Sequence, residues 1–123
     1  SDFIRAALDL LVYEREADRA LVLAAGVPLK WLDGDGIAIE RLRTPHGELS
    51  YTLNRNGTRL TLAIAGGLTS PAGGLVFKWP YAGSPGKATN NGRRMRWQKN
   101  KSGDELRIRA LPALIEIEGV RSQ

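Results

Sequence analysis

The chain has 123 residues, which is typical of one domain with a core large enough to fold without cross-links. It has no cysteine, which excludes a disulfide framework and a thiolate zinc site, and no apolar run long enough to span a membrane. The formal net charge of +5 is unevenly distributed, because residues 49–103 carry nine basic side chains and no acidic one. A stretch of one charge sign favours attraction to polyanions.

The first segment has the spacing of an amphipathic helix. Phe3, Ala7 and Leu11 recur at intervals of four residues, which predicts a helix over residues 2–14. Its apolar stripe is broad for a surface helix, so we expect it to pack on another element. Because the chain starts at Ser1 without an initiator methionine, we interpret it as a piece of a longer protein.

After residue 18 the hydrophobic period changes to two, which is the period of a strand. Residues 20–23 are apolar at every position and predict a strand buried on both faces. One helical turn is expected over residues 29–32. Pro28 and Trp31 are expected to fix the corner there, with Trp31 as its apolar plug.

Clean alternation of apolar and polar residues then continues towards the C-terminus. The predicted strands cover residues 37–40, 49–54, 60–64, 75–79, 87–90, 94–97, 106–109 and 113–118. Gly47, Gly57 and Gly92 are expected to serve turn geometry, and the last two belong to Asn-Gly pairs that favour tight hairpins. The pattern predicts an all-β, antiparallel β-sandwich of about eight to nine short strands preceded by one N-terminal helix. The predicted division is a helix over residues 1–18 and a sandwich over residues 19–123.

Several motifs carry a resemblance to a known family. Residues 26–31 (Gly-Val-Pro-Leu-Lys-Trp), an Asp/Gly turn, a strand and residues 44–51 (Thr-Pro-His-Gly-Glu-Leu-Ser-Tyr) follow one another. This order is similar to the C-terminal β-sandwich that follows the six-hairpin, or (α/α)6, barrel of bacterial glycoside hydrolases. The relatives include rhamnosidase-like and fucosidase-like enzymes, some with coagulation factor 5/8 type discoidin modules. Residues 88–93 and 106–113 resemble the closing strands of those domains, so the resemblance covers residues 20–118.

The resemblance implies an accessory role. In such enzymes the catalytic acid and base lie in the helical barrel, which this chain lacks, so no catalytic residue carries over. The implied function is a non-catalytic C-terminal module that stabilises or docks on the barrel of the same parent chain, with no cofactor. The N-terminal helix would then be the last helix of that barrel, or the linker from it. The sequence indicates no localisation, although a secreted parent glycosidase would place the chain in the periplasm or outside the cell.

The alternative function depends on the basic segment over residues 87–101. Its cations are Lys87, Arg93, Arg94, Arg96, Lys99 and Lys101. We expect Arg94 and Arg96 to project from one strand face, where an anionic polysaccharide or another polyanion could bind. A solvated face, or pairing with acids from the first 48 residues, is the competing interpretation. The chain has no RNP-like aromatic motif and no helix-turn-helix spacing, which argues against nucleic acid.

Aromatic side chains are candidates for stacking on a sugar ring, so carbohydrate is a candidate ligand. Alternation of side chains along the predicted strands places Trp79 and Trp97 in the core. Tyr81 follows a proline in a loop and is expected to be exposed. The predicted binding residues are therefore Tyr81, Arg94, Arg96 and Lys99.

Catalytic and metal sites are not indicated. His46 is the only histidine and lies in a Pro-His-Gly turn. Residues 33–36 begin like a calcium loop but lack the glycine and glutamate that an EF-hand needs at its sixth and twelfth positions, so we expect a plain turn. Alternation directs Glu40, Glu116 and Glu118 outward, which favours solvated side chains over a hydrolytic pair.

Overall fold

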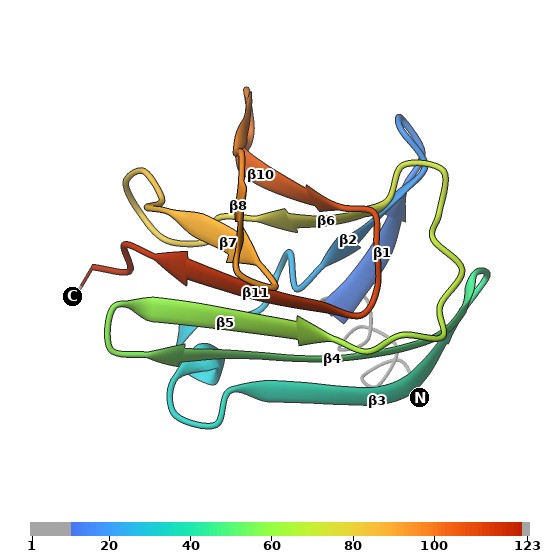
Figure 1. Cartoon of the computed structure of the whole chain (residues 1–123), viewed down its shortest axis with the longest axis horizontal. Helices are drawn as coiled ribbons and strands as arrows, with labels where there is room; N and C mark the ends of the chain where they lie inside the picture. Colours follow the sequence, from blue (N-terminus) through green and yellow to red (C-terminus); the bar gives the residue numbers. More distant parts are fainter. Residues whose placement is uncertain (1–10, 122–123) are drawn as a thin grey trace.

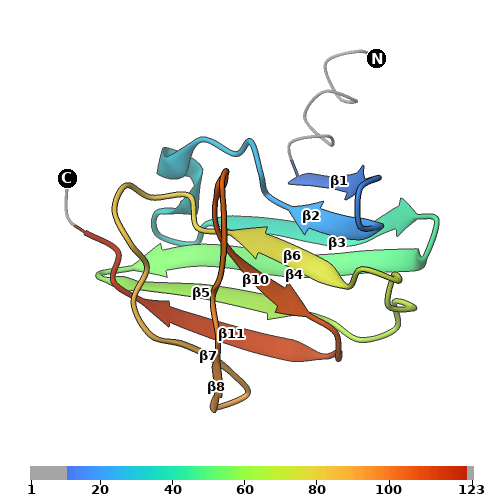
Figure 2. The ribbon, with the colours of Figure 1, turned by 90° about the horizontal axis from the view of Figure 1, so that it is seen from above.

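The chain forms two β-sheets packed face to face, as Figures 1 and 2 show. The computed structural model describes residues 11–121. The first sheet has five strands, in the order β1 (Val12–Arg15), β2 (Ala20–Leu23), β6 (Leu75–Lys78), β10 (Gly103–Ile108) and β9 (Gln98–Asn100). The second has six, in the order β3 (Ile37–Thr44), β4 (Gly47–Asn56), β5 (Arg59–Ile64), β11 (Ala113–Glu118), β7 (Ala88–Asn90) and β8 (Arg93–Met95). Within the described residues, no helix is long and apolar enough to cross a membrane.

Side chains that point between the sheets form one apolar core. Leu60, Leu62 and Ile115 of the six-stranded sheet are fully buried in the same cluster as Phe77 and Leu106 of the five-stranded sheet. These residues alternate with outward-facing ones along each strand, as a sandwich requires. All neighbouring strands are antiparallel except β2 and β6, which are parallel. The predicted all-β sandwich is confirmed.

The centre of the five-stranded sheet is buried on both faces. Leu21 and Leu23 of β2 point into the core, whereas Ala20 and Val22 lie on the outer face beside Val76 of β6. All three outer residues are 0% exposed. The prediction of a doubly buried strand over residues 20–23 is therefore confirmed.

Tyr51 connects the start of the five-stranded sheet to β4. Its ring is buried in the core, and its hydroxyl donates a hydrogen bond to the carbonyl of Leu11, just before β1. The Ala24 N–H donates to the same carbonyl at 2.9 Å. Burial raises the pKa of Tyr51, so the hydroxyl remains protonated and able to donate.

The predicted helix over residues 2–14 is wrong at its C-terminal end, and residues 2–10 lie outside the described residues. Val12–Arg15 is strand β1, which pairs with β2 along its whole length. Val12 and Tyr13 have high β-propensity, and pairing with β2 supplies hydrogen bonds that the helical spacing did not anticipate. This segment therefore joins the sandwich although it precedes residue 19.

The structure has more strands than the eight or nine we expected. The helical segment contributed one of them, and the predicted strand over residues 94–97 is the other difference. The observed strand there, β8, ends at Met95, and the additional strand β9 begins at Gln98, after the predicted strand ends. The strand breaks because the chain leaves one sheet and enters the other.

The expectation that Trp31 plugs the corner is wrong, because its side chain is 47% exposed. The helical turn predicted over residues 29–32 is present as the 3₁₀ helix η1 (Leu29–Leu32), which follows Pro28. A 3₁₀ helix has three residues per turn, so Leu29 and Leu32 share one side and Trp31 points elsewhere. Leu32, which is 2% exposed, fills the corner.

The predicted turn glycines adopt conformations that other residues avoid. Gly47, Gly57 and Gly92 have φ values of +116°, +64° and +85°. Asn91 and Gly92 form the two-residue turn between β7 and β8, and both have positive φ, as a type I′ turn requires. The Asn91-Gly92 hairpin prediction is confirmed. The second predicted hairpin also forms, but its turn residues are Gly57 and Thr58, because Asn56 pairs with Arg59 at the end of β4.

Candidate functional site

The segment between β8 and β10 crosses from one sheet to the other. β8 is the last strand of the six-stranded sheet and β9 is the last strand of the five-stranded sheet. Residues 96 and 97 connect them, so residues 93–101, which we call the crossover segment, run along one side of the sandwich. Figure 1 shows this segment in orange, rising from β8 towards β10.

The crossover segment and the residue just before β7 carry a group of exposed cations. This group, the crossover cations, consists of Lys87, Arg93, Arg94, Arg96, Lys99 and Lys101, all of which are exposed. The structure brings the predicted binding residues Arg94, Arg96 and Lys99 to this one side, whereas Tyr81 lies in the loop after β6.

Arg94 and Arg96 do not project from one strand face as predicted, because β8 ends at Met95. Arg94 pairs with Thr89, which in turn pairs with Glu116, so Arg94 belongs to the outer face of the six-stranded sheet. Arg96 lies beyond the end of β8, and Lys99 lies on β9 in the other sheet. The prediction is wrong because it assumed an unbroken strand, and the result is a cationic border along the side of the sandwich.

Within residues 11–121, the crossover cations form no ion pair, whereas other cations do. Arg55 binds Asp33 at 2.7 Å, and Arg59 binds both Glu116 and Glu118 on the outer face of the six-stranded sheet. Glu116 and Glu118 therefore lie on the outer face, as predicted. Arg55 and Arg59 thus hold three of the nearby carboxylates, and Asp104, the cross-strand partner of Lys99, forms no ion pair with it.

A groove accompanies the cations. Arg94, Met95, Arg96 and Trp97 line a hollow of about 560 Å³. Met95 and Trp97 pack against the core on one side and are only partly buried. The residues that line the groove are therefore two arginines, one methionine and one tryptophan.

Trp97 is held in place by its neighbours. Its indole Nε1–H donates a hydrogen bond of 2.9 Å to the carbonyl of Gly86. Its ring meets Trp79 edge-on, with centroids 5.9 Å apart and an interplanar angle of 76°, and Trp79 contacts Tyr81 at 5.3 Å. Edge-to-face and tilted pairs of this kind are favourable arrangements for aromatic rings.

Tyr81 is less accessible than we expected. It packs against the core, and its hydroxyl is buried without a hydrogen-bond partner among the described residues. Burial raises the pKa of Tyr81. Its contact with Trp79, which is only 9% exposed, draws the ring inward and makes it a support for the aromatic cluster.

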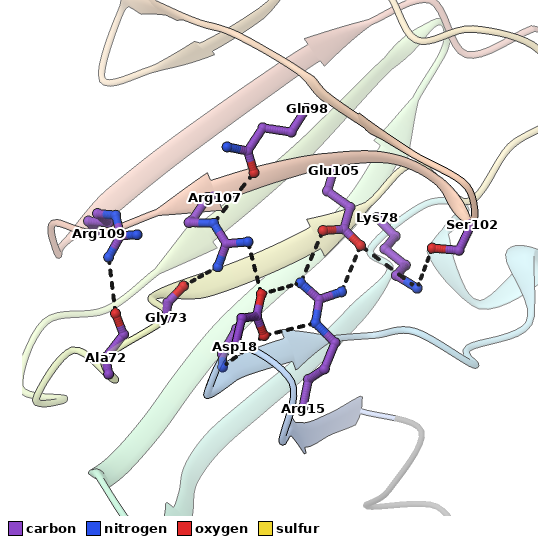
Figure 3. A network of polar contacts seen from close by, with 11 residues as sticks. Arg15, Asp18, Ala72, Gly73, Lys78, Gln98, Ser102, Glu105, Arg107 and Arg109 are labelled. Carbon is purple, nitrogen blue, oxygen red and sulfur yellow. Dashed lines mark hydrogen bonds and ion pairs between the residues drawn. The ribbon is translucent and has the colours of Figure 1, made fainter.

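A charge network that sequence reasoning missed covers the outer face of the five-stranded sheet (Figure 3). Glu105 of β10 is 0% exposed, and Arg15 of β1 donates to its carboxylate at 2.7 Å although β2 and β6 lie between them. Arg15 also binds Asp18, which is shared with Arg107, and Lys78 lies 3.8 Å from Glu105.

This network consists of paired, structural charges. Hydrogen bonds from Arg15 lower the pKa of Asp18 and of Glu105, and the same bonds raise the pKa of Arg15. One signal in the sequence pointed to this network. Residues 20–23 are apolar at every position, which indicates a buried outer face, and a carboxylate on such a face needs a cation as its partner.

The outer face of the six-stranded sheet carries a second hollow, of about 460 Å³. Small side chains from neighbouring strands line it, including Ala38, Thr52 and Ala63. Leu114 at its border is 42% exposed. No group of three or more His, Asp or Glu side chains in the described part of the chain could hold a metal ion.

Comparisons with known proteins found no relatives. No protein-family model, no curated protein and no solved structure matches this chain. The resemblance to the accessory domain of glycoside hydrolases therefore stays a prediction, as does the assignment of the N-terminal segment to a barrel, apart from Val12–Arg15, which form β1 of the sandwich.

Proposed function

We propose that the chain is a non-catalytic β-sandwich module that binds a polyanion through its crossover cations. The observation that carries this proposal is the absence of ion-pair partners for these cations within residues 11–121. Clustered, unpaired like charges repel one another, and a bound polyanion relieves that repulsion.

The arrangement of the cations suits an extended ligand. They follow a segment that spans the side of the sandwich from β8 to β9, so a linear polymer can contact several of them at once. Release of counterions from such a polymer adds affinity for each charge neutralised. Arginine also presents a planar fork of donors that fits carboxylate, sulfate or phosphate groups.

Retention on heparin resin tests the proposal. We expect wild-type protein to bind at low salt, and Arg94→Ala/Arg96→Ala to elute at a clearly lower salt concentration. The matched control is Lys30→Ala/Arg43→Ala, which removes the same charge from η1 and from β3 at the opposite edge of the six-stranded sheet. Failure of wild type to bind, or equal elution of the two double variants, would refute the proposal.

A second proposal follows from the resemblance: the module docks on the helical catalytic barrel of a parent glycoside hydrolase. The hollow on the outer face of the six-stranded sheet favours it, because small side chains such as Ala38 and Ala63 beside exposed Leu114 allow close approach of another surface. The isolated chain should then not hydrolyse aryl glycosides. Turnover that disappears when a carboxylate such as Glu40 is replaced would contradict a non-catalytic role.

A further inference from the structure

We infer that the groove beside Trp97 binds one unit of an anionic polysaccharide, with the sugar ring on the indole and its acidic group on Arg94 and Arg96. This inference rests on the proposed function, because it names the class of polyanion and the place where a ring is held. It concerns four residues that line one groove, Arg94, Met95, Arg96 and Trp97.

The two arginines can act on a single ligand unit. One residue, Met95, separates them in the chain, so their Cα atoms lie at most about 7 Å apart. Both side chains are exposed and make no ion pair within the part of the chain that the structure describes. Guanidinium groups bind carboxylates and sulfates through paired hydrogen bonds, which fixes both distance and orientation.

Trp97 adds a fixed apolar surface beside the crossover cations. The hydrogen bond to Gly86 and the contact with Trp79 hold the indole, so little conformational freedom is lost on binding. Because Nε1–H is already used, the remaining contribution of Trp97 is its ring surface. Apolar C–H groups of a sugar ring pack well on such a surface.

The groove suits a sugar better than a nucleic acid. Proteins that bind single-stranded nucleic acid stack successive bases on several aromatic rings. Here one aromatic side chain lines the groove, and the exposed aromatics Tyr13 and Trp31 lie on β1 and η1 instead. A single ring flanked by two guanidinium groups matches a ligand in which each ring carries its own acidic group.

Binding to four probes tests the inference: oligogalacturonate, a heparin oligosaccharide, inorganic polyphosphate and an oligothymidylate. The first two have acidic sugar rings, and polyphosphate has charge without rings. We expect Trp97→Ala to weaken binding of the saccharides about tenfold, which corresponds to about 1.4 kcal/mol. Binding of polyphosphate should change less than about twofold, and Trp97→Phe should retain most of the saccharide affinity. Trp31→Ala is the matched control, because it removes an exposed indole elsewhere.

A second readout avoids dependence on a variant that fails to fold. The indole ¹H–¹⁵N signal of Trp97, assigned with Trp97→Phe, should shift on addition of oligogalacturonate to wild type and stay unchanged with polyphosphate. An unshifted signal, equal losses for polyphosphate and saccharide, or tighter binding of oligothymidylate would overturn the inference and leave the polyanion proposal intact. Absence of binding to every probe would refute the polyanion proposal and this inference with it.

Discussion

Replacing Arg15 by methionine tests whether the charge network holds the β1 edge on the sheet. The substitution keeps an apolar stem of similar length and removes the guanidinium, which donates two hydrogen bonds to Asp18 and two to Glu105, at 2.7 to 3.1 Å. Glu105 is 0% exposed, so its carboxylate would then depend on Lys78 at 3.8 Å.

The structure sets the size of the effect. Breaking a buried ion pair by removing one partner costs about 3–5 kcal/mol. The Arg15 side chain is 21% exposed and Lys78 remains nearby, so the expected loss in free energy of unfolding falls below that range, at about 2–3 kcal/mol. Replacing Arg15 and Glu105 together by methionine removes the stranded charge and should bring stability back to within about 1 kcal/mol of wild type.

Urea unfolding followed by tryptophan fluorescence measures both variants, and the double-mutant cycle gives the coupling energy. Arg59→Met is the control, because its pairs with Glu116 and Glu118 are exposed and should contribute little. A coupling energy below about 0.5 kcal/mol would refute the reasoning, since the two residues would then act independently.

Three further predictions concern pH, backbone and core. Arg15 lowers the pKa of Glu105 below its ordinary value of 4.5 in the folded chain, so the unfolded chain takes up the proton first as pH falls. The free energy of unfolding should therefore decrease below about pH 4.5, and it should decrease less steeply in Arg15→Met. Urea unfolding at a series of pH values measures both. Gly36→Ala should destabilise the fold more than Gly34→Ala in thermal melts, because both have positive φ but a Cβ on Gly36 would lie 2.1 Å from a backbone oxygen and a Cβ on Gly34 meets nothing. Leu32→Ala should cost about 2–5 kcal/mol by urea unfolding, since Leu32 fills the corner; a loss under about 1 kcal/mol would contradict that role.

The strands of the six-stranded sheet could be predicted from sequence because one of their faces is solvated. In the segments 49–54, 60–64 and 113–118, apolar side chains alternate with polar ones, and the apolar ones point inward. The Asn91-Gly92 turn could be predicted in the same way, because positive φ at both positions favours such residues.

The remaining differences come from contacts between distant parts of the chain. Val12–Arg15 has a helical spacing, but its partner β2 decides its conformation. The break after Met95 depends on which sheet offers an edge, which the local sequence does not encode. Alternation over residues 106–109 identified which of those side chains point inward, but it gave no indication that Glu105, just before them, is buried and bound by Arg15.

The candidate site was predictable in composition and not in geometry. The absence of acids over residues 49–103 indicated a cationic region, and the structure gathers its later part into a border along one side. The groove formed with Trp97 could not be predicted, because alternation along an unbroken strand over residues 94–97 assigned Trp97 to the core.

The salt dependence of heparin affinity tests the central claim most directly. The slope of log K against log salt counts the ionic contacts released, with about one unit for each cation that touches the polymer. Wild-type protein should bind with a steep negative slope, and Arg94→Ala/Arg96→Ala should reduce its magnitude by about two, while Lys30→Ala/Arg43→Ala leaves it unchanged. Equal slopes for all three proteins would contradict the assignment of polyanion binding to the crossover cations.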